Sequence, residues 1–155
     1  MKKVSKSRTI PKESGILNGF SRVDYSDVYE IKKVTNKTAK EVSLEILELP
    51  NWVKLLLYIR KALLKAFGVK VGKRNNKQET FFTLIKESEN EVIMGEADKH
   101  LDFRASVVVD KSKKSISFIT VVHFNNLWGK IYLLLIKPFH KIILRSLLKR
   151  QLMRD

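Results

Sequence analysis

Hydrophobic and polar positions alternate in four successive runs in the second half of the chain. The runs are Thr80–Lys86, Glu91–Ala97, Leu101–Asp110 and Ser115–Asn125. A period of two is typical of β-strands, which place successive side chains on opposite faces of a sheet. The breaks between the runs are short and polar, as the loops of β-hairpins are. These runs therefore predict an antiparallel meander.

The segment before the meander predicts one strand and a first helix. Asp27–Val34 is rich in strand-forming residues. Thr38 and Glu41 have the spacing of a capping box, in which each side chain binds a free backbone N–H of the other residue. A helix is expected to run from this box to about Leu49. Pro50 then ends it, because proline restricts the residue before it.

A second helix is predicted to start after Asn51, a good N-cap residue, and to end before Gly68, which suits the C′ position. Its apolar residues recur at helical spacing, which predicts one buried face. These residues are Trp52, Leu56, Ile59, Leu63 and Phe67, and Lys54, Lys61 and Lys65 fall on another face. Residues 69–78 form a polar connection to the meander.

A long final helix is predicted over about Leu127 to Leu152, with a kink at Pro138. Its apolar face is expected to pack against the sheet. That face carries Trp128, Ile131, Tyr132, Leu135, Phe139 and Ile142, and Lys130, Lys137, Lys141 and Arg145 lie opposite. The element order predicts an α+β fold with a curved antiparallel sheet wrapped around this helix, as a single domain over residues 23–155. Residues 1–22, rich in lysine and serine, are expected to be a mobile or loosely docked basic tail.

Charge is the unusual feature of the composition. The chain has 31 Lys and Arg against 16 Asp and Glu, a formal net charge of +15. Such a field attracts nucleic acid, anionic lipid and acidic ligands alike. The chain has no cysteine, which excludes disulfides and thiolate chemistry. It shows neither a secretory signal nor an uncharged apolar stretch of membrane-spanning length, so a cytoplasmic protein is expected.

Four short motifs stand out in the last third of the chain. Gly95–Arg104 reads Gly-Glu-Ala-Asp-Lys-His-Leu-Asp-Phe-Arg, and Thr120–Asn126 reads Thr-Val-Val-His-Phe-Asn-Asn. Gly129–Leu133 reads Gly-Lys-Ile-Tyr-Leu, and Pro-Phe-His stands at 138–140. Together these motifs resemble the bacterial family catalogued as domain of unknown function 2867. The resemblance implies the helix-grip fold of the START-like (SRPBCC) superfamily, with a groove between sheet and C-terminal helix. It implies no activity, and no cofactor motif such as Gly-x-Gly-x-x-Gly is present.

His100, Asp102 and Arg104 alternate along one strand and therefore share one face. If that face lines the cavity, Arg104 binds an anionic ligand head and His100 acts near neutral pH. If the role is structural, Arg104 pairs with a carboxylate, most plausibly Asp102, Asp98 or Glu96, and His100 ends a hairpin. A metal site built from His100, His123 and His140 with Asp98 or Asp102 has little support, because nothing in the spacing groups them.

The leading hypothesis is a binding module without chemistry of its own, which holds a hydrophobic or amphipathic small molecule between the sheet and the C-terminal helix. The expected ligand-binding residues are His100, Asp102, Arg104, His123, Trp128, Tyr132 and Phe139. The alternative is a basic surface that binds an anionic membrane or, less favoured, nucleic acid, through residues 1–12 and the lysine faces of the last two helices. A third hypothesis is a cofactor-independent enzyme that uses His100 and Asp102.

Overall fold

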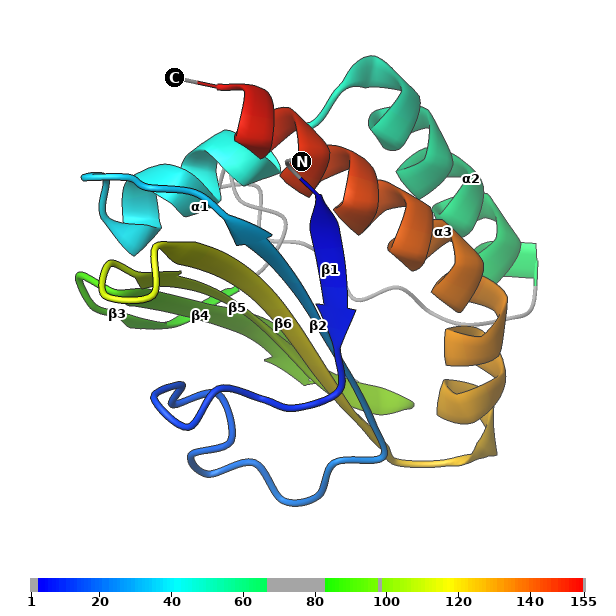
Figure 1. The fold of residues 1–155 in the computed structure, drawn as a ribbon. Coiled ribbons are helices and arrows are strands. Elements are labelled where there is room, and N and C mark those ends of the chain that lie inside the picture. Colours follow the sequence, from blue (N-terminus) through cyan, green and yellow to red (C-terminus); the bar gives the residue numbers. More distant parts are fainter. Residues whose placement is uncertain (1–2, 67–82, 98, 155) are drawn as a thin grey trace.

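The computed structural model describes residues 3–66, 83–97 and 99–154. These residues form a curved, six-stranded antiparallel sheet and three helices (Figure 1). In chain order the elements are β1 Val4–Ser7, β2 Tyr25–Lys32, α1 Ala39–Leu47, α2 Asn51–Ala66, β3 Thr83–Glu87, β4 Glu91–Ala97, β5 Leu101–Asp110, β6 Ser115–Phe124 and α3 Leu127–Met153. The α+β class and the long C-terminal helix are confirmed.

The meander predicted from the alternating runs is confirmed. The strand order is β1-β2-β6-β5-β4-β3, so β3 to β6 are neighbours in sequence and in the sheet. The predicted bounds of β4 and β5 agree with the structure residue for residue. The first predicted strand, β2, pairs with β6, with Asp27 opposite Thr120. β1 lies beyond β2 at the edge of the sheet.

The two helices that follow β2 also form. Thr38 caps α1 in the expected capping box, because its hydroxyl accepts from the Glu41 N–H and the Glu41 carboxylate accepts from the Thr38 N–H. α2 already begins at Asn51, the predicted cap, since the Pro50 carbonyl accepts the N–H groups of Val53 and Lys54. The predicted helix end at Gly68 lies outside the described residues.

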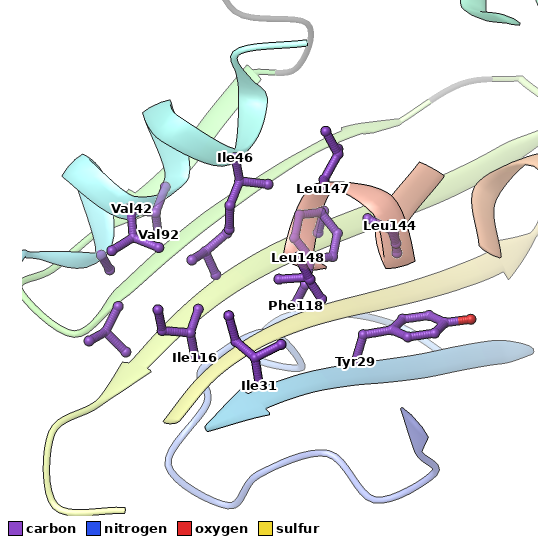
Figure 2. Packing of buried hydrophobic residues seen from close by; sticks show 14 of the residues in the cluster. Tyr29, Ile31, Val42, Ile46, Val92, Ile116, Phe118, Leu144, Leu147 and Leu148 are labelled. Atoms are coloured by element: carbon purple, nitrogen blue, oxygen red, sulfur yellow. The ribbon is translucent and has the colours of Figure 1, made fainter. Parts of the chain in front are cut away.

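One face of the sheet packs against α1 and the second half of α3 (Figure 2). Leu144, Leu147 and Leu148 from α3 meet Val42 and Ile46 of α1. They rest on strand residues that include Tyr29, Ile31, Val92, Ile116 and Phe118. Burying branched side chains of this size typically stabilises a fold by about 1.5–3 kcal/mol each, so this cluster carries most of the hydrophobic stabilisation.

The opposite face of the sheet is covered by the chain that precedes β2. Ile16 is fully buried there against Ile93, Val108 and Ile119, and Ile10 and Phe20 pack at its edges. Residues 4–7 form edge strand β1, which pairs with β2. Residues 1–22 were expected to be a mobile or loosely docked tail, and in the structure Ile10, Ile16 and Phe20 of this stretch pack against the sheet. The physical reason is that both faces of β5 and β6 are apolar, and the second face also has to be covered.

The first half of α3 differs most from expectation. Its predicted inward face is largely exposed: Trp128 is 52% exposed, and Phe139 and Ile142 are exposed as well. Apart from Gly129 in the first turn, the buried residues of α3 lie after residue 143. In Figure 1 the first turns of α3 run in another direction than the rest of the helix, as expected of a helix that contains Pro138.

The predicted buried face of α2 is wrong at two of its positions, because Trp52 and Ile59 are exposed. Leu56 is half-buried, Leu63 and Phe67 have side chains outside the described part of the chain, and Val53, which was not expected on that face, is fully buried. α2 lies beside α3 rather than on the sheet (Figure 1). The helical periodicity of α2 was therefore assigned correctly. The element that α2 lies beside is α3 and not the sheet.

Candidate functional site

The sequence motif around His100 forms a corner where β5 begins, β6 ends and α3 starts. The amide Nδ2 of Asn126 lies 3.0 Å from Nδ1 of His100, and the Asn125 side chain donates to Asp102 at 3.0 Å. Asn126 also caps α3 by accepting the N–H of Gly129. His100 and Asp102 thus join two strands and a helix at one corner.

Gly129 is required by the close approach of α3 to β5. A Cβ atom built on Gly129 would lie 2.1 Å from the carbonyl oxygen of His100. No side chain fits at that distance, so glycine lets the first turn of α3 rest on the strand. Much of the motif that suggested a binding site therefore shapes this corner.

Arg104 lies on the face of the sheet that α3 does not cover. Its Nη1 donates to the carbonyl oxygens of Ile16 at 2.9 Å and Asn18 at 2.6 Å, and its guanidinium stands over the ring of Phe20. Among the described residues, Arg104 donates to backbone carbonyls and not to the expected carboxylates of Asp102 or Glu96, and Asp98 lies outside the described residues. Arg104 fixes the N-terminal segment onto the sheet.

Glu91 makes the second polar attachment of that segment. Its carboxylate accepts from the Gly15 N–H at 2.8 Å, from the Ser14 hydroxyl at 2.5 Å and from Ser106 at 2.6 Å. Sequence reasoning overlooked this residue, because a glutamate at the start of a predicted strand is usually solvated. Arg104 and Glu91 together bind backbone groups of Gly15, Ile16 and Asn18 in a segment without regular secondary structure.

His123 of β6 stands directly opposite Asp102 of β5 in the sheet. Its Nδ1 lies 2.9 Å from the carboxylate of Asp24, which also accepts the backbone N–H of Phe124 at 2.8 Å. The Phe124 hydrogen bond, opposed by partial desolvation and helped by Arg22 and His123, holds the pKa of Asp24 below its usual range. This arrangement ties the start of β2 to the end of β6.

The seven predicted ligand-binding residues fall into two groups. Asp102, Arg104 and His123 lie on the sheet face opposite α3, where Asp102 pairs with His123, and His100 holds the corner at the start of β5. The remaining three lie on the first half of α3, where Trp128 and Phe139 are exposed and Tyr132 is half-buried. Among the described residues, no group of three or more His, Cys, Asp or Glu side chains is arranged to bind a metal ion.

A different polar cluster lies on the sheet face beneath α3. Asp27 of β2 is 1% exposed, and its Oδ2 accepts a hydrogen bond from the Tyr25 hydroxyl at 2.7 Å and lies 3.3 Å from Nε2 of His140. The same imidazole nitrogen is 3.3 Å from the Thr120 hydroxyl. Pairing of β2 with β6 places Asp27 opposite Thr120, and α3 brings His140 over them. We call Tyr25, Asp27, Thr120 and His140 the Asp27 cluster.

Electrostatics keep the buried Asp27 carboxylate charged. Burial opposes the charge, but the hydrogen bond and charge of His140, together with the Tyr25 hydroxyl, outweigh it and hold the pKa of Asp27 below its ordinary value. For Tyr25, burial and the neighbouring Asp27 raise the pKa of the phenol. Tyr25 therefore stays a hydrogen-bond donor at neutral pH. Lys137 places its ammonium 5.1 Å from the centre of the Tyr25 ring.

The second carboxylate oxygen of Asp27 is the unusual atom of the cluster. Oδ1 is buried and accepts no hydrogen bond from any residue that the structure describes. A buried, unpaired polar atom is costly, so it calls for a further partner such as an ordered water, an ion or a bound group. Sequence reasoning missed this cluster, although the alternating Tyr25, Asp27 and Tyr29 and the Pro-Phe-His motif were signals for it.

A pocket in the structure lies away from the groove that was expected between the sheet and α3. A pocket of about 110 Å³ lies between the end of β2 and the β5–β6 turn, and its lining includes Lys33, Val34, Asp110 and Lys114. Ligand sites usually have about 300–1,000 Å³. This pocket is too small for an amphipathic molecule and lies away from α3.

The antiparallel sheet, the three helices and the corner motif define an α+β domain built around a long C-terminal helix. The profile of the family described as "Protein of unknown function (DUF2867)" matches residues 20–147, and the chain belongs to this family. The match begins at Phe20, the last residue of the segment that covers the second face of the sheet. No match was found among curated proteins or among solved structures. Among the described residues, no helix is long and apolar enough to cross a membrane.

Proposed function

We propose that the chain is a START-like (SRPBCC) helix-grip domain of the cytoplasm that binds a hydrophobic or amphipathic small molecule between the sheet and the first half of α3. The observation that carries the proposal is the buried Asp27 carboxylate, whose Oδ1 accepts no hydrogen bond from the described residues. It lies on the sheet face that a helix-grip domain uses for its ligand.

The way α3 is attached supports this location. Its second half is anchored by Leu144, Leu147 and Leu148 in the main core, whereas its first half contributes half-buried side chains such as Tyr132 and Ile136. Pro138, which cannot donate a backbone hydrogen bond, lies between the halves. The first half can therefore move away from the sheet at lower cost than the second, and this movement would open the groove.

The chemistry of the Asp27 cluster selects the head of the ligand. A charged carboxylate oxygen accepts hydrogen bonds only, so it fits a hydroxyl or amine that donates. An anionic head is disfavoured there, because it would face the Asp27 charge in a desolvated site. Arg104, which was expected to bind an anionic head, instead binds the carbonyls of Ile16 and Asn18.

Thermal melts and isothermal titration with two matched ligand panels test the proposal. Long-chain alcohols and amines should raise the melting temperature of the wild-type protein, and fatty acids of equal chain length should do so less. Asp27→Asn should reduce the affinity for alcohols about tenfold or more, since a charge-assisted hydrogen bond contributes about 1.5–3 kcal/mol. Arg104→Lys serves as the control, because it lies on the other face and should leave affinity unchanged.

The contrary result is equally clear. If Asp27→Asn binds every amphiphile as the wild type does, the Asp27 cluster is not the head-group site. If fatty acids bind best and Arg104→Lys abolishes their binding, the ligand lies on the opposite face of the sheet.

A further inference from the structure

The outer sides of α2 and the first half of α3 carry an unusual number of exposed apolar residues. On α2 the exposed side chains include Leu55 (59%) and Tyr58 (71%), and on α3 they include Leu127 (70%) and Leu134 (64%). Trp52, Ile59, Trp128, Ile131, Leu135, Phe139 and Ile142 extend the same two helices. We call the exposed apolar and basic side chains of Asn51–Ala66 and residues 127–142 the α2–α3 surface.

Charge on these helices has one sign. α2 and α3 contain no Asp or Glu, whereas α2 carries four Lys or Arg residues and α3 carries six. Lys54, Lys61 and Lys65 are exposed on α2, and Lys130 and Lys141 are exposed on α3. All 16 acidic residues of the chain therefore lie elsewhere. The α2–α3 surface combines positive charge with aliphatic and aromatic side chains.

We infer that the α2–α3 surface docks on an anionic lipid bilayer, with both helices lying in the plane of the interface. An amphipathic helix binds a membrane in this way when its apolar face enters the boundary of the acyl chains and its lysines remain among the head groups. Tryptophan and tyrosine favour this boundary, because their rings are amphipathic. The inference goes beyond the proposed ligand and does not depend on the Asp27 cluster.

Two features favour a bilayer over nucleic acid as the anionic partner. Nucleic-acid surfaces present phosphates to basic side chains and bases to aromatic ones, but they have no use for exposed leucine and isoleucine. Leu55, Leu134 and Leu135 are exposed aliphatic residues on the same two helices as the exposed lysines. The expected contribution of residues 1–12 also changes, because residues 4–7 pair with β2 on the sheet.

A second copy of the chain is less suited to the α2–α3 surface than a bilayer is. A symmetric dimer through this surface would bring two sets of lysines together without a carboxylate on either helix to compensate them. Like charges facing each other across an interface destabilise it. Anionic lipid compensates these charges and accepts the apolar side chains at the same time.

Vesicle co-sedimentation of the full chain tests the inference. Vesicles of pure phosphatidylcholine should bind weakly, and vesicles with 30% phosphatidylglycerol (about one anionic lipid in three) should bind strongly at low salt. The double variant Lys130→Gln/Lys141→Gln should lose affinity about 30-fold, since each basic residue near an anionic surface contributes about 1 kcal/mol. Leu55→Gln/Leu134→Gln should lose about tenfold or more.

Matched controls use residues of the same type outside the α2–α3 surface. Lys86→Gln on β3 and Val34→Gln between β2 and α1 are both exposed and should leave vesicle binding unchanged. Tryptophan emission should shift to the blue on binding, because Trp52 and Trp128 lie within the surface. All variants change exposed side chains and should therefore keep the fold. Unchanged melting temperatures would verify this.

Three results would overturn the inference. Vesicle binding that the α2–α3 variants and the controls share equally would place the contact elsewhere. A wild-type protein that binds RNA but not anionic vesicles would make nucleic acid the partner. A dimer in sedimentation velocity that Leu55→Gln/Leu134→Gln dissociates would show that a second copy covers the surface. If Asp27→Asn loses amphiphile binding but binds vesicles as the wild type does, membrane docking is supported as a property independent of the Asp27 cluster.

Discussion

Arg104 shows how a charged residue in the middle of an apolar strand is accommodated without a carboxylate. Two backbone carbonyls and an aromatic ring surround its guanidinium. Carbonyl groups of an irregular segment need donors when they approach a sheet face, and arginine supplies several from one fork. The side chain and the segment that it binds therefore stabilise each other.

Arg104→Lys is expected to destabilise the protein by about 1.5–3 kcal/mol, because a single ammonium cannot serve both carbonyls with the same geometry. The loss should be the same with and without amphiphiles. Urea unfolding measures it. Arg22→Lys is the control, since Arg22 forms an exposed ion pair with Asp24 that contributes less than about 1 kcal/mol. Equal losses for the two variants would contradict this role of Arg104.

Asp27 should also make stability depend on pH. Its pKa is lowered in the folded protein, so the charged form is favoured by folding. The contribution is complete above the unfolded pKa of about 3.9 and is lost as pH falls through the folded value. The difference in unfolding free energy between wild type and Asp27→Asn should therefore be largest near neutral pH and shrink below about pH 4.

Thr120→Val provides the comparison for this pH series. It removes the hydroxyl that contacts His140 but adds no titrating group, so its destabilisation should stay nearly constant over the acid range. A constant difference for Asp27→Asn across that range would show that Asp27 is not held ionised by its partners.

At the scale of elements, α3 combines two helices of different character. The residues after 143 bury their side chains in the core, and the residues before it expose most of theirs. The hydrophobic pattern is similar along the whole helix, yet the second half packs into the main core with the sheet and α1. The first half touches the sheet mainly through Gly129 and His140. The same periodicity thus serves a core in one half and a surface in the other.

Alanine substitutions should reveal this division. Leu148→Ala, at a fully buried position, should cost about 2–5 kcal/mol through lost burial and the remaining cavity. Trp128→Ala should cost about 1 kcal/mol or less, although tryptophan is the larger side chain, because 52% of it is exposed. Chemical denaturation measures both. A cost for Trp128→Ala above that for Leu148→Ala would mean that the first half of α3 is packed in solution.

At the scale of the whole molecule, the sheet is covered on both faces by chain segments of different kinds. Helices cover one face, and residues 10–20 cover the other without regular secondary structure. Ile16 is the apolar anchor of that second layer, and Glu91 and Arg104 are its polar attachments. The N-terminal segment therefore belongs to the folded unit in physical terms.

Ile16→Ala is expected to destabilise the entire protein by about 2–5 kcal/mol, the usual loss at a fully buried isoleucine. Its neighbour Leu17 is 42% exposed, so Leu17→Ala should cost less than about 1 kcal/mol. Thermal or urea unfolding compares the pair. Similar, small losses would show that the segment before β2 is detached from the sheet.

The sequence by itself determined most of the secondary structure. The capping box at Thr38, the break at Pro50 and the alternation through β4 and β5 are properties of neighbouring residues, and the structure confirms each of them. The α+β class and the meander follow from the order of these elements. The profile match of residues 20–147 agrees with the resemblance that the motifs of the last third carry.

Tertiary structure alone decided which faces meet. Both faces of β5 are apolar near its end, so alternation could not tell which one α3 covers or that Ile16 covers the other. It likewise could not show that Asp27 and His140, more than 100 residues apart, lie in contact in one polar cluster. Hydrophobic periodicity predicts which face of a helix or strand is apolar. Which residues that face contacts depends on the long-range packing of the whole chain.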